Sequence, residues 1–257
     1  MDKTVMVKNF SRNAFEYDNY STIRRRCAND LISHIKGHDP ADILEIGCGT
    51  GIYTDVLSEN HSEARIVAMD ISEEMVRAAR EKNSNVTLEF RVADAENAFV
   101  YKKYDLITSN ASFQWFTDMD KTLNKMKNAL SNNGKLCFSM YGPETFRELE
   151  EVLSLCLGER KWLTSGKFIS LGEIEKILRK HFKDVVLSEK RYVAEFSSLW
   201  DFLKDIKLSG TRGDGLRKKT FIGRDRIKEM EHIYREKFGS IFATHHVFFC
   251  VAKTPYS

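Results

Sequence analysis

An alternation of short apolar runs with helical patterns, which begins at residue 42, most constrains the fold of this chain. The runs are rich in Ile, Val, Leu and Phe, as strands are, and the segments between them have the length and spacing of helices. The expected strands are residues 42–46, 65–70, 86–94, 104–110 and 134–141, and the expected helices are residues 52–58, 73–81 and 119–130. Such an alternation is typical of βαβ units around a parallel sheet. We therefore predict an α/β fold with a doubly wound, mostly parallel sheet.

Segments before and after this alternation in the sequence add further helices. Residues 20–35 predict a helix with one apolar face that would lie over the sheet. That face carries Ile23, Cys27, Leu31 and Ile35. Further helices are expected at 144–157 and 171–181, and further strands at 184–196 and 245–253. Between these two strands, the pattern predicts a mostly helical insertion rich in Lys and Arg.

We expect one domain over residues 1–257, because no Pro-rich or Gly-rich linker divides the chain. Its parts are an N-terminal helical cap (1–40), a Rossmann-like core (41–196), the basic helical insertion as a lid (197–243) and a final strand (244–257).

Composition and residue spacing exclude several classes of protein. With 42% hydrophobic and 30% charged residues, the chain resembles an ordinary folded protein. No secretory signal begins it, and the apolar run 247–252 is far shorter than the roughly 20 residues that cross a bilayer. We therefore expect a cytoplasmic protein without a membrane partner. Five scattered cysteines without C-x-x-C, and seven histidines without H-E-x-x-H, predict no metal site.

The charge is unevenly distributed, although the net charge is only +3. Residues 41–140 carry 11 Lys and Arg against 15 Asp and Glu, whereas residues 204–237 carry 11 against 6. The basic insertion therefore suits an acidic partner.

The stretch EIGCGTG, from Glu45 to Gly51, joins the first strand to the first helix of the alternation. In a doubly wound sheet, this turn approaches the ligand most closely. Its spacing is G-x-G-x-G and not the G-x-G-x-x-G of dinucleotide sites. A carboxylate at Glu45 would repel a pyrophosphate but suits a ligand with an ammonium group. The turn therefore favours a nucleoside that carries an amino acid, although three glycines in a tight turn can also serve packing alone.

Polar side chains at the ends of three other strands support the same kind of ligand. Asp70 lies 19 residues after Gly51, where a carboxylate can accept hydrogen bonds from both ribose hydroxyls. Asp94 and its neighbouring backbone can read an adenine edge, and Asn110 ends the strand beside the first. Each of these side chains alone is more typical of a solvated strand end or a helix cap. Together they predict a nucleoside site.

The pattern E-x-G-x-G-x-G, the acidic residue, the D-A pair and DLITSN resemble the class I S-adenosylmethionine-dependent methyltransferases over about residues 40–140. The flanking stretches FSRNAFEYD, SNASFQWF, FSMYGPETFREL, LKDIKLSGTRG and ATHHVFFCVAK resemble the malonyl-acyl carrier protein O-methyltransferases of biotin synthesis. With these pieces the resemblance covers nearly the whole chain. It implies that S-adenosyl-L-methionine is the cofactor.

The resemblance also implies roles for residues at the cofactor site. The methionine part would be held by Glu45, Gly47, Cys48, Gly49 and Gly51. The ribose and adenine would be held by Asp70, Asp94 and Ala95, with Ile71, Met75 and Asn110 close by and Tyr17 closing over the cofactor. The chain departs from the pattern at Arg24, where relatives usually have Gln. Arg24, Arg25 and Arg26 fit a role in substrate binding as well as ordinary solvated charges.

Methyl transfer to a carboxylate requires little catalytic machinery. The sulfonium methyl is activated, and a malonyl carboxylate is ionised at neutral pH, so no general base is needed and positioning is the main task. The candidates for facing the substrate are Gln114, Trp115, Tyr141 and Arg212, whereas Phe113 is expected in the core. For docking of an acidic acyl carrier protein, the candidates are Lys204, Lys207, Arg217, Lys218 and Lys219. The partner would be malonyl-loaded acyl carrier protein or malonyl-coenzyme A.

Three other functions stay open at this point. A methyltransferase for small carboxylic acids of the aconitate type would share the core but not need the basic insertion. A nucleic-acid methyltransferase would use the insertion on phosphates, but the insertion has few of the aromatic residues on which single-stranded bases stack, so we expect no nucleic-acid partner. A cofactor-binding assembly factor would keep the fold without methyl transfer.

Overall fold

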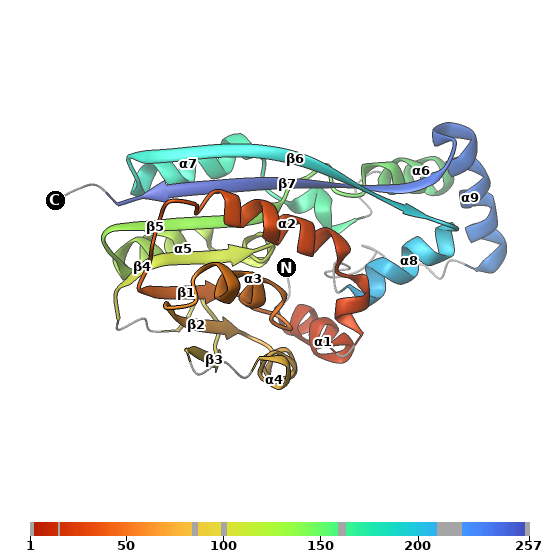
Figure 1. The fold of residues 1–257 in the computed structure, drawn as a ribbon. Helices are drawn as coiled ribbons and strands as arrows, with labels where there is room; N and C mark the ends of the chain where they lie inside the picture. The colour runs from red at the N-terminus through yellow and green to blue at the C-terminus, as the bar shows by residue number, and fades with distance from the viewer. Residues whose placement is uncertain are drawn as a thin grey trace.

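A computed structural model describes residues 3–14, 16–83, 87–98, 102–158, 163–209 and 223–254. Within them, seven strands form one sheet in the order β3-β2-β1-β4-β5-β7-β6 (Figure 1). The strands are β1 (Asp42–Ile46), β2 (Arg65–Asp70), β3 (Leu88–Val92), β4 (Tyr104–Asn110), β5 (Leu130–Tyr141), β6 (Asp184–Phe196) and β7 (Ile241–Lys253). The first five strands are parallel, and β7 is antiparallel to both β5 and β6. The fold is therefore the predicted doubly wound α/β fold.

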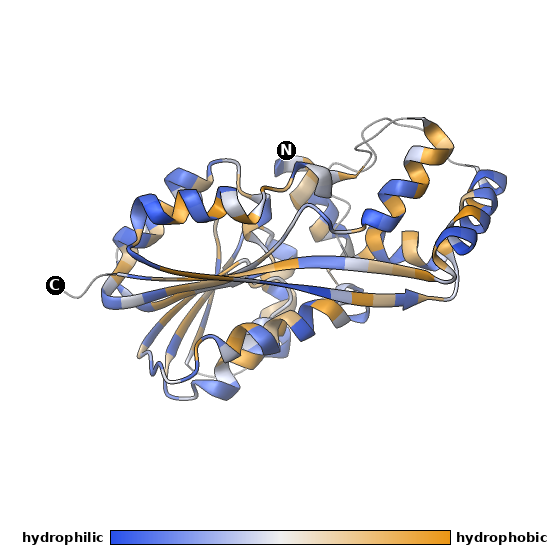
Figure 2. Ribbon diagram, turned by 90° about the horizontal axis from the view of Figure 1, so that it is seen from above, coloured by the Kyte–Doolittle hydropathy of each residue, from blue (hydrophilic) through white to orange (hydrophobic). Residues whose placement is uncertain are grey.

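Helices cover both faces of the sheet, as the view from above shows (Figure 2). One face is covered by α2 (Thr22–Ser33), α3 (Ile52–Asn60) and α4 (Glu73–Lys82), whose apolar side chains pack on alternate residues of the strands. The other face packs against α5 (Met119–Ala129) and α7 (Leu171–His181). The predicted apolar face of α2 is confirmed, because Cys27, Leu31 and Ile35 are completely buried and Ile23 is nearly so.

The strand order reverses between β1 and β4, because the chain runs outward from β1 to β3 and then returns to lie beside β1. Ligands of doubly wound sheets bind at such a switch point, outside the carboxyl ends of the strands. The remaining short elements include α1 (Lys3–Asn13), η1 (Tyr17–Tyr20), η2 (Phe113–Trp115) and η3 (Thr164–Lys167). Both α1 and η1 belong to the segment that precedes β1, and they lie at the switch-point end of the sheet (Figure 1).

Besides the core on the two faces of the sheet, a separate hydrophobic cluster lies around the end of β6 and the beginning of β7 (Figure 1). It joins α6 (Arg147–Leu157), α8 (Leu199–Leu208) and α9 (Arg224–Phe238), and we call it the C-terminal helical cluster. Its core includes Phe146, Leu149, Phe202, Tyr234 and Ile241. Two of the three helices come from the predicted insertion, so that insertion packs mainly against α6 and the strand ends.

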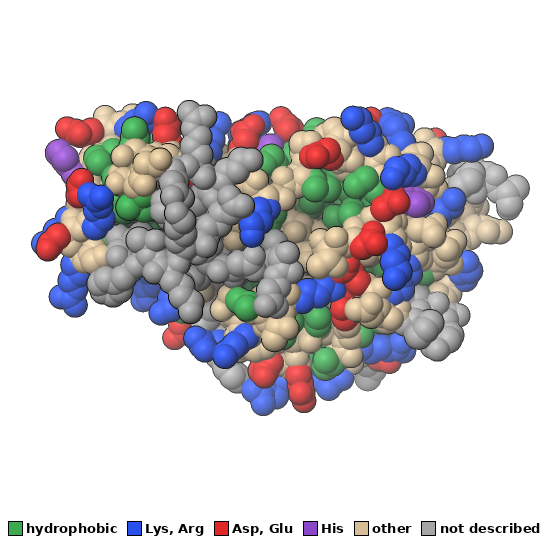
Figure 3. Space-filling model, turned by 180° about the vertical axis from the view of Figure 1, so that it is seen from behind, with side chains coloured by type: hydrophobic (Ala, Val, Ile, Leu, Met, Phe, Trp, Pro, Cys, Tyr) green, Lys and Arg blue, Asp and Glu red, His purple; other side chains and the backbone are tan. Residues whose placement is uncertain are grey.

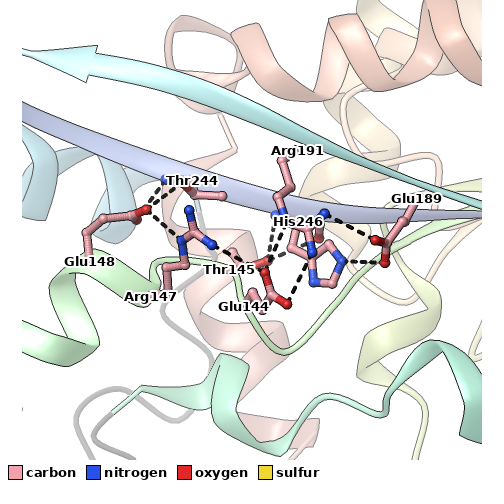
Figure 4. Close-up of polar contacts among 8 residues, drawn as sticks. All are labelled: Glu144, Thr145, Arg147, Glu148, Glu189, Arg191, Thr244 and His246. Atoms are coloured by element: carbon pink, nitrogen blue, oxygen red, sulfur yellow. Dashed lines mark hydrogen bonds and ion pairs between the residues drawn. The ribbon is translucent and has the colours of Figure 1, made fainter.

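A buried carboxylate fastens α6 to β7 (Figure 4). Glu148 accepts hydrogen bonds from the backbone nitrogen of Thr244 at 3.1 Å and from its hydroxyl at 2.6 Å. Arg147 completes the arrangement with an ion pair to Glu148 at 3.0 Å. Nearby, the edge strand β6 is linked by Arg191 to Glu144 at 3.0 Å. These contacts fix the C-terminal helical cluster relative to the sheet.

The structure corrects the expected bounds of some elements. The third strand is shorter than residues 86–94, since β3 spans Leu88–Val92. The last strand begins at Ile241, not at residue 245, and the expected insertion therefore ends too late. The reason is that pairing with β6 continues to Ile241 opposite Phe196, where the C-terminal helical cluster buries the strand end. No described helix has the length and apolar character needed to span a membrane.

Candidate active site

The turn between β1 and α3 is built by the three glycines of the EIGCGTG stretch. Gly47, Gly49 and Gly51 have φ angles of 71°, 55° and 89°, in the left-handed region that favours glycine. A Cβ at Gly47 would collide with Ser112, and one at Gly51 would lie 2.7 Å from the amide of Asn83. A Cβ at Gly49 would meet its nearest neighbour only at 3.9 Å. Gly49 is therefore open to a ligand, whereas Gly47 and Gly51 are also required for packing.

A cavity of about 700 Å³, which we call the first cavity, lies beside this turn at the carboxyl ends of β1, β2 and β4. The predicted cofactor residues that line it are Tyr17, Gly47, Gly49, Asp70, Ile71, Met75, Asp94, Ala95 and Asn110. Trp115, which was predicted to face the substrate, lines it as well. The switch point thus brings together residues that are far apart in the sequence.

Asp70 is the carboxylate at the centre of this cavity wall. Its Oδ2 accepts a hydrogen bond from the backbone nitrogen of Gly49 at 2.9 Å, and its Oδ1 accepts one from that of Ser72 at 2.9 Å. Burial raises the pKa of Asp70, while these backbone hydrogen bonds act in the opposite direction. A carboxylate oxygen has more than one acceptor site, so both oxygens can still accept from ribose hydroxyls.

Three residues predicted to hold the methionine part do not line the first cavity. Cys48 packs with Ala68 and Val76 under α4, and Gly51 is covered by α4 as well. Glu45 is 1% exposed and lies behind the turn, where its Oε2 accepts from the hydroxyl of Thr54 at 2.6 Å. Its Oε1 is buried without a hydrogen-bond partner among the described residues. Burial raises the pKa of Glu45 to about 8. Glu45, Cys48 and Gly51 therefore pack on the side of the turn that faces away from the first cavity.

The adenine end of the first cavity has an ion pair that the sequence analysis did not anticipate. The ammonium of Lys3 lies 2.8 Å from both carboxylate oxygens of Asp94 and also pairs with Glu96. Partial burial opposes ionisation of Asp94, but the hydrogen bonds from Lys3, the backbone of Glu96 and Asn97, together with the charge of Lys3, outweigh it and lower the pKa. The Asp94 carboxylate, which lines the first cavity beside Ala95, is thus already paired within the protein.

The helix α1 lines one side of the first cavity, and the sequence analysis did not predict this. Met6 and Phe10, one turn apart, both line the cavity. The ring of Phe10 meets those of Trp115 and Tyr17 edge-on, with centroid distances of 5.8 and 6.2 Å. The available signal was the spacing of Met6 and Phe10 at i and i+4, which places both side chains on one face of a helix.

Two predicted residues are engaged in hydrogen bonds within the protein. Gln114 donates to the carbonyl of Ala111 at 2.7 Å and accepts from the backbone nitrogen of Tyr141 at 3.3 Å, so its amide links η2 to β5. Gln114 lines neither the first cavity nor the second cavity described below. Asn110 donates to the carbonyl of Arg24 at 3.0 Å and accepts from Ser139 at 2.7 Å. Phe113 is fully buried in the core, as expected.

A second cavity of about 820 Å³ lies between α2, α8 and the strands β5, β6 and β7. Its lining includes Tyr141 from β5, Arg24 from α2, Asp205 from α8 and His245 from β7. The guanidinium carbon of Arg24 lies 4.6 Å from the centroid of the Tyr17 ring, so a residue of the second cavity stacks on a residue of the first. Arg24 is 7% exposed and donates to the carbonyl of Ser209 at 2.7 Å. The second cavity thus places a buried cation beside the first cavity.

The predicted docking residues are only partly described. Lys204 and Lys207 lie on α8 with exposed side chains. Arg217, Lys218 and Lys219 lie outside the described residues, and so does Arg212, which was predicted to face the substrate. Within the described part of the chain, the structure has no group of three or more His, Cys, Asp or Glu that could hold a metal ion.

Comparison with known proteins identifies the core. A family described as "Methyltransferase domain" matches residues 44–138. A malonyl-acyl carrier protein O-methyltransferase 1 of Ilyobacter polytropus is 38% identical over 98% of this chain and 94% of its own length. A malonyl-acyl carrier protein O-methyltransferase of Acetivibrio thermocellus is 34% identical over the same shares of the two chains.

Solved structures share the fold at low sequence identity. The YcgJ protein of Bacillus subtilis has a TM-score of 0.62 at 15% identity and covers 90% of this chain and 99% of its own. Phosphoethanolamine N-methyltransferase 2 of Haemonchus contortus, solved in complex with S-adenosyl-L-methionine, has a TM-score of 0.60 at 16% identity. That match covers 95% of this chain and 57% of the other.

The first cavity fits S-adenosyl-L-methionine, the cofactor of this chain. Gly49 provides backbone next to open space, Asp70 provides a buried carboxylate with free acceptor sites, and Phe10, Met75 and Trp115 provide apolar walls. This combination of few polar groups in an apolar cleft is typical of nucleoside sites. With the core match and relatives above 30% identity over almost the whole length, the chain belongs to the malonyl-acyl carrier protein O-methyltransferases, a family of S-adenosylmethionine-dependent methyltransferases.

Proposed function

We propose that this enzyme methylates the free carboxylate of a malonyl thioester carried by an acyl carrier protein, as an early step of biotin synthesis. The observation that carries the proposal is the relationship over 98% of the chain to proteins of that name, because it includes α8 and the second cavity as well as the methyltransferase core. The second cavity supports the proposal, since it places a cation beside the first cavity and an anionic acceptor would be held there.

The protein's own part in the reaction is to bind and orient. Bound S-adenosyl-L-methionine supplies a methyl group that is already activated by a sulfonium. Asp70 would hold the ribose and the backbone at Gly49 the methionine part, and α1 would exclude water through Met6 and Phe10. An ionised carboxylate acceptor needs no general base, so positioning of this kind supplies most of the rate, up to roughly 7 to 11 kcal/mol in favourable systems.

The exposed face of α8 supports docking of an acidic carrier protein. Trp200, Lys204 and Lys207 lie at i, i+4 and i+7 on this helix, all with exposed side chains. Asp205 and Ser209, from the same helix and its end, line the second cavity. A carrier protein bound to α8 would lie close to the second cavity, which its thioester arm has to enter. Lysines of this kind steer an acidic partner and set its register.

A nucleic-acid substrate is less well supported. On the face shown in Figure 3, Lys and Arg side chains are interspersed with Asp and Glu wherever the structure describes the surface. Binding to a phosphate backbone depends instead on a continuous array of cations. This distribution favours a protein-bound or small acidic substrate.

The decisive assay offers labelled S-adenosyl-L-methionine with one candidate acceptor at a time. The acceptors are malonyl-acyl carrier protein, malonyl-coenzyme A, aconitate and RNA. We expect base-labile label on the malonyl thioesters. Label on aconitate alone would show a small-acid methyltransferase, label on RNA alone would end the carboxylate proposal, and cofactor binding without transfer to any acceptor would favour an assembly factor.

Docking on α8 is tested by charge reversal. Lys204→Glu is expected to lower kcat/KM for malonyl-acyl carrier protein at low salt and to leave malonyl-coenzyme A turnover unchanged, because only the carrier protein contacts the helix face. The matched control is Lys176→Glu on α7, an exposed lysine at the opposite end of the sheet (Figure 1). Equal turnover of the carrier-bound substrate by both variants would refute docking at α8. Lys218→Glu with Lys219→Glu extends the test to the rest of the basic insertion.

A further inference from the structure

The second cavity contains a buried guanidinium that has no tight anionic partner among the residues the structure describes. Arg24 stacks on Tyr17 and donates one hydrogen bond, to the carbonyl of Ser209. Two acidic residues, Asp205 and Glu195, also line this cavity, and no ion pair within 4.0 Å joins either of them to Arg24. Burial raises the pKa of Asp205 to about 6, although Arg24 acts in the opposite direction. A buried cation normally has a close anion as its partner, so the cavity has room for one supplied by a ligand.

The same cavity contains a neutral imidazole with an unused polar atom. His245 is 5% exposed and lines the cavity between the rings of Tyr141 and Phe146, at centroid distances of 5.8 and 4.9 Å. Its Nδ1 is buried and has no hydrogen-bond partner among the described residues. Burial lowers the pKa of His245 to about 3, so the ring is uncharged at neutral pH. A neutral imidazole can hydrogen-bond an uncharged carbonyl without the cost of an additional buried charge.

These two groups match the two polar ends of one small acyl group. A malonyl thioester has an anionic carboxylate at one end and an uncharged thioester carbonyl at the other. The carboxylate has to lie closest to the methyl group, and Arg24 is the group that adjoins the first cavity through Tyr17. We propose that the second cavity is the acceptor site, in which Arg24 binds the free carboxylate and His245 donates a hydrogen bond to the thioester carbonyl. This assignment rests on the proposed function and adds the residues that recognise its substrate.

Arg24 therefore determines specificity for an acyl group that ends in a carboxylate. An acetyl thioester has the same carbonyl but no anion, so it would engage His245 and not Arg24. The preference for malonyl over acetyl thioesters should depend on Arg24, whereas His245 should contribute equally to both. A purely structural role, in which Arg24 only fastens α8 to α2 through Ser209, would affect both thioesters alike.

The experiment compares the KM for malonyl-coenzyme A with the inhibition constant of acetyl-coenzyme A. In the wild type we expect a clear preference for the malonyl thioester. Arg24→Gln should raise the malonyl KM roughly 10- to 100-fold, the usual effect of losing a hydrogen bond to a charged group, and leave acetyl binding within about 2-fold. Arg24→Lys, which keeps the charge, should restore part of the preference. His245→Phe should weaken both thioesters by similar factors.

Controls separate recognition from folding. Arg25→Gln changes the neighbouring arginine, which is 54% exposed and does not line the cavity, and should behave as the wild type. The Kd for S-adenosylhomocysteine and the melting temperature report whether each variant is folded and binds the cofactor product. If the wild type methylates malonyl-coenzyme A and Arg24→Gln keeps the full malonyl preference, the acceptor-site assignment is wrong. If the wild type methylates no malonyl thioester, the proposed function itself is wrong.

Discussion

Replacing Asp70 by alanine should separate cofactor binding from folding. In the structure, both carboxylate oxygens accept backbone hydrogen bonds, from Gly49 and Ser72, at 2.9 Å each. The carboxylate also faces the first cavity, where the ribose hydroxyls would donate to it. Asp70→Ala therefore removes contacts of two kinds, within the protein and with the cofactor, and their magnitudes differ.

The loss in affinity should exceed the loss in stability. A hydrogen bond to a charged group contributes about 1.5–3 kcal/mol, so removal of the ribose contacts should cost about 3 kcal/mol, or roughly 100-fold in Kd. The backbone nitrogens of Gly49 and Ser72 lose a partner, but water can reach them from the cavity. In the variant, the energetic cost of burying the carboxylate, which raises its pKa in the wild type, is also removed. We expect the free energy of unfolding to fall by only about 1–2 kcal/mol.

Calorimetric titration with S-adenosylhomocysteine and urea unfolding measure the two quantities. The matched control is Asp118→Ala, since Asp118 caps α5 through a hydrogen bond from the backbone nitrogen of Lys121 at 2.9 Å and lies outside the first cavity. It should lose about 1 kcal/mol of stability with unchanged Kd. A folded Asp70→Ala variant with wild-type affinity would refute the assignment of Asp70 to the ribose.

Three further variants test other parts of the structure. Phe10→Ala should weaken S-adenosylhomocysteine binding roughly 3- to 10-fold, because the edge contacts to Trp115 and Tyr17 are lost; an unchanged Kd would show that α1 is not part of the site. Glu45 has its pKa raised to about 8 by burial, so its stability contribution is present below its ordinary value of 4.5 and is lost as the pH rises toward 8. The melting temperature of the cofactor-free wild type should therefore fall more steeply over this range than that of Glu45→Gln, and parallel curves would contradict the shift. Glu148→Ala leaves the buried amide and hydroxyl of Thr244 without their acceptor and should cost about 2–4 kcal/mol in urea unfolding with no change in Kd, whereas a loss below 1 kcal/mol would show that water replaces the carboxylate.

Most of the sheet could be predicted from the sequence because its signals are local. The strands β1, β2, β4 and β6 have the expected bounds, since each is a continuous or alternating apolar run. The helices α3, α4 and α5 begin at the expected residues, where Gly51, Ser72 and Asp118 precede them. The position of the first cavity follows from topology, because the switch point lies at the end of β1.

Other features depend on contacts between distant segments and have no local signal. The burial of Arg24 requires α8 and Tyr17, and the pairing of Lys3 with Asp94 requires α1 to lie over the end of β3. Glu45 was predicted to hold the methionine part of the cofactor, but its side chain is directed behind the turn to Thr54 and does not line the first cavity. Strand β7 begins early because the C-terminal helical cluster covers its first residues, which lack strand periodicity of their own.

The most direct test of the account is the mass of malonyl-acyl carrier protein after incubation with the enzyme and S-adenosyl-L-methionine. We predict that the carrier protein gains the mass of one methyl ester, that mild base removes it, and that Arg24→Gln gains it far more slowly while still binding S-adenosylhomocysteine. A carrier protein of unchanged mass, with a wild-type enzyme that binds the cofactor normally, would contradict the account.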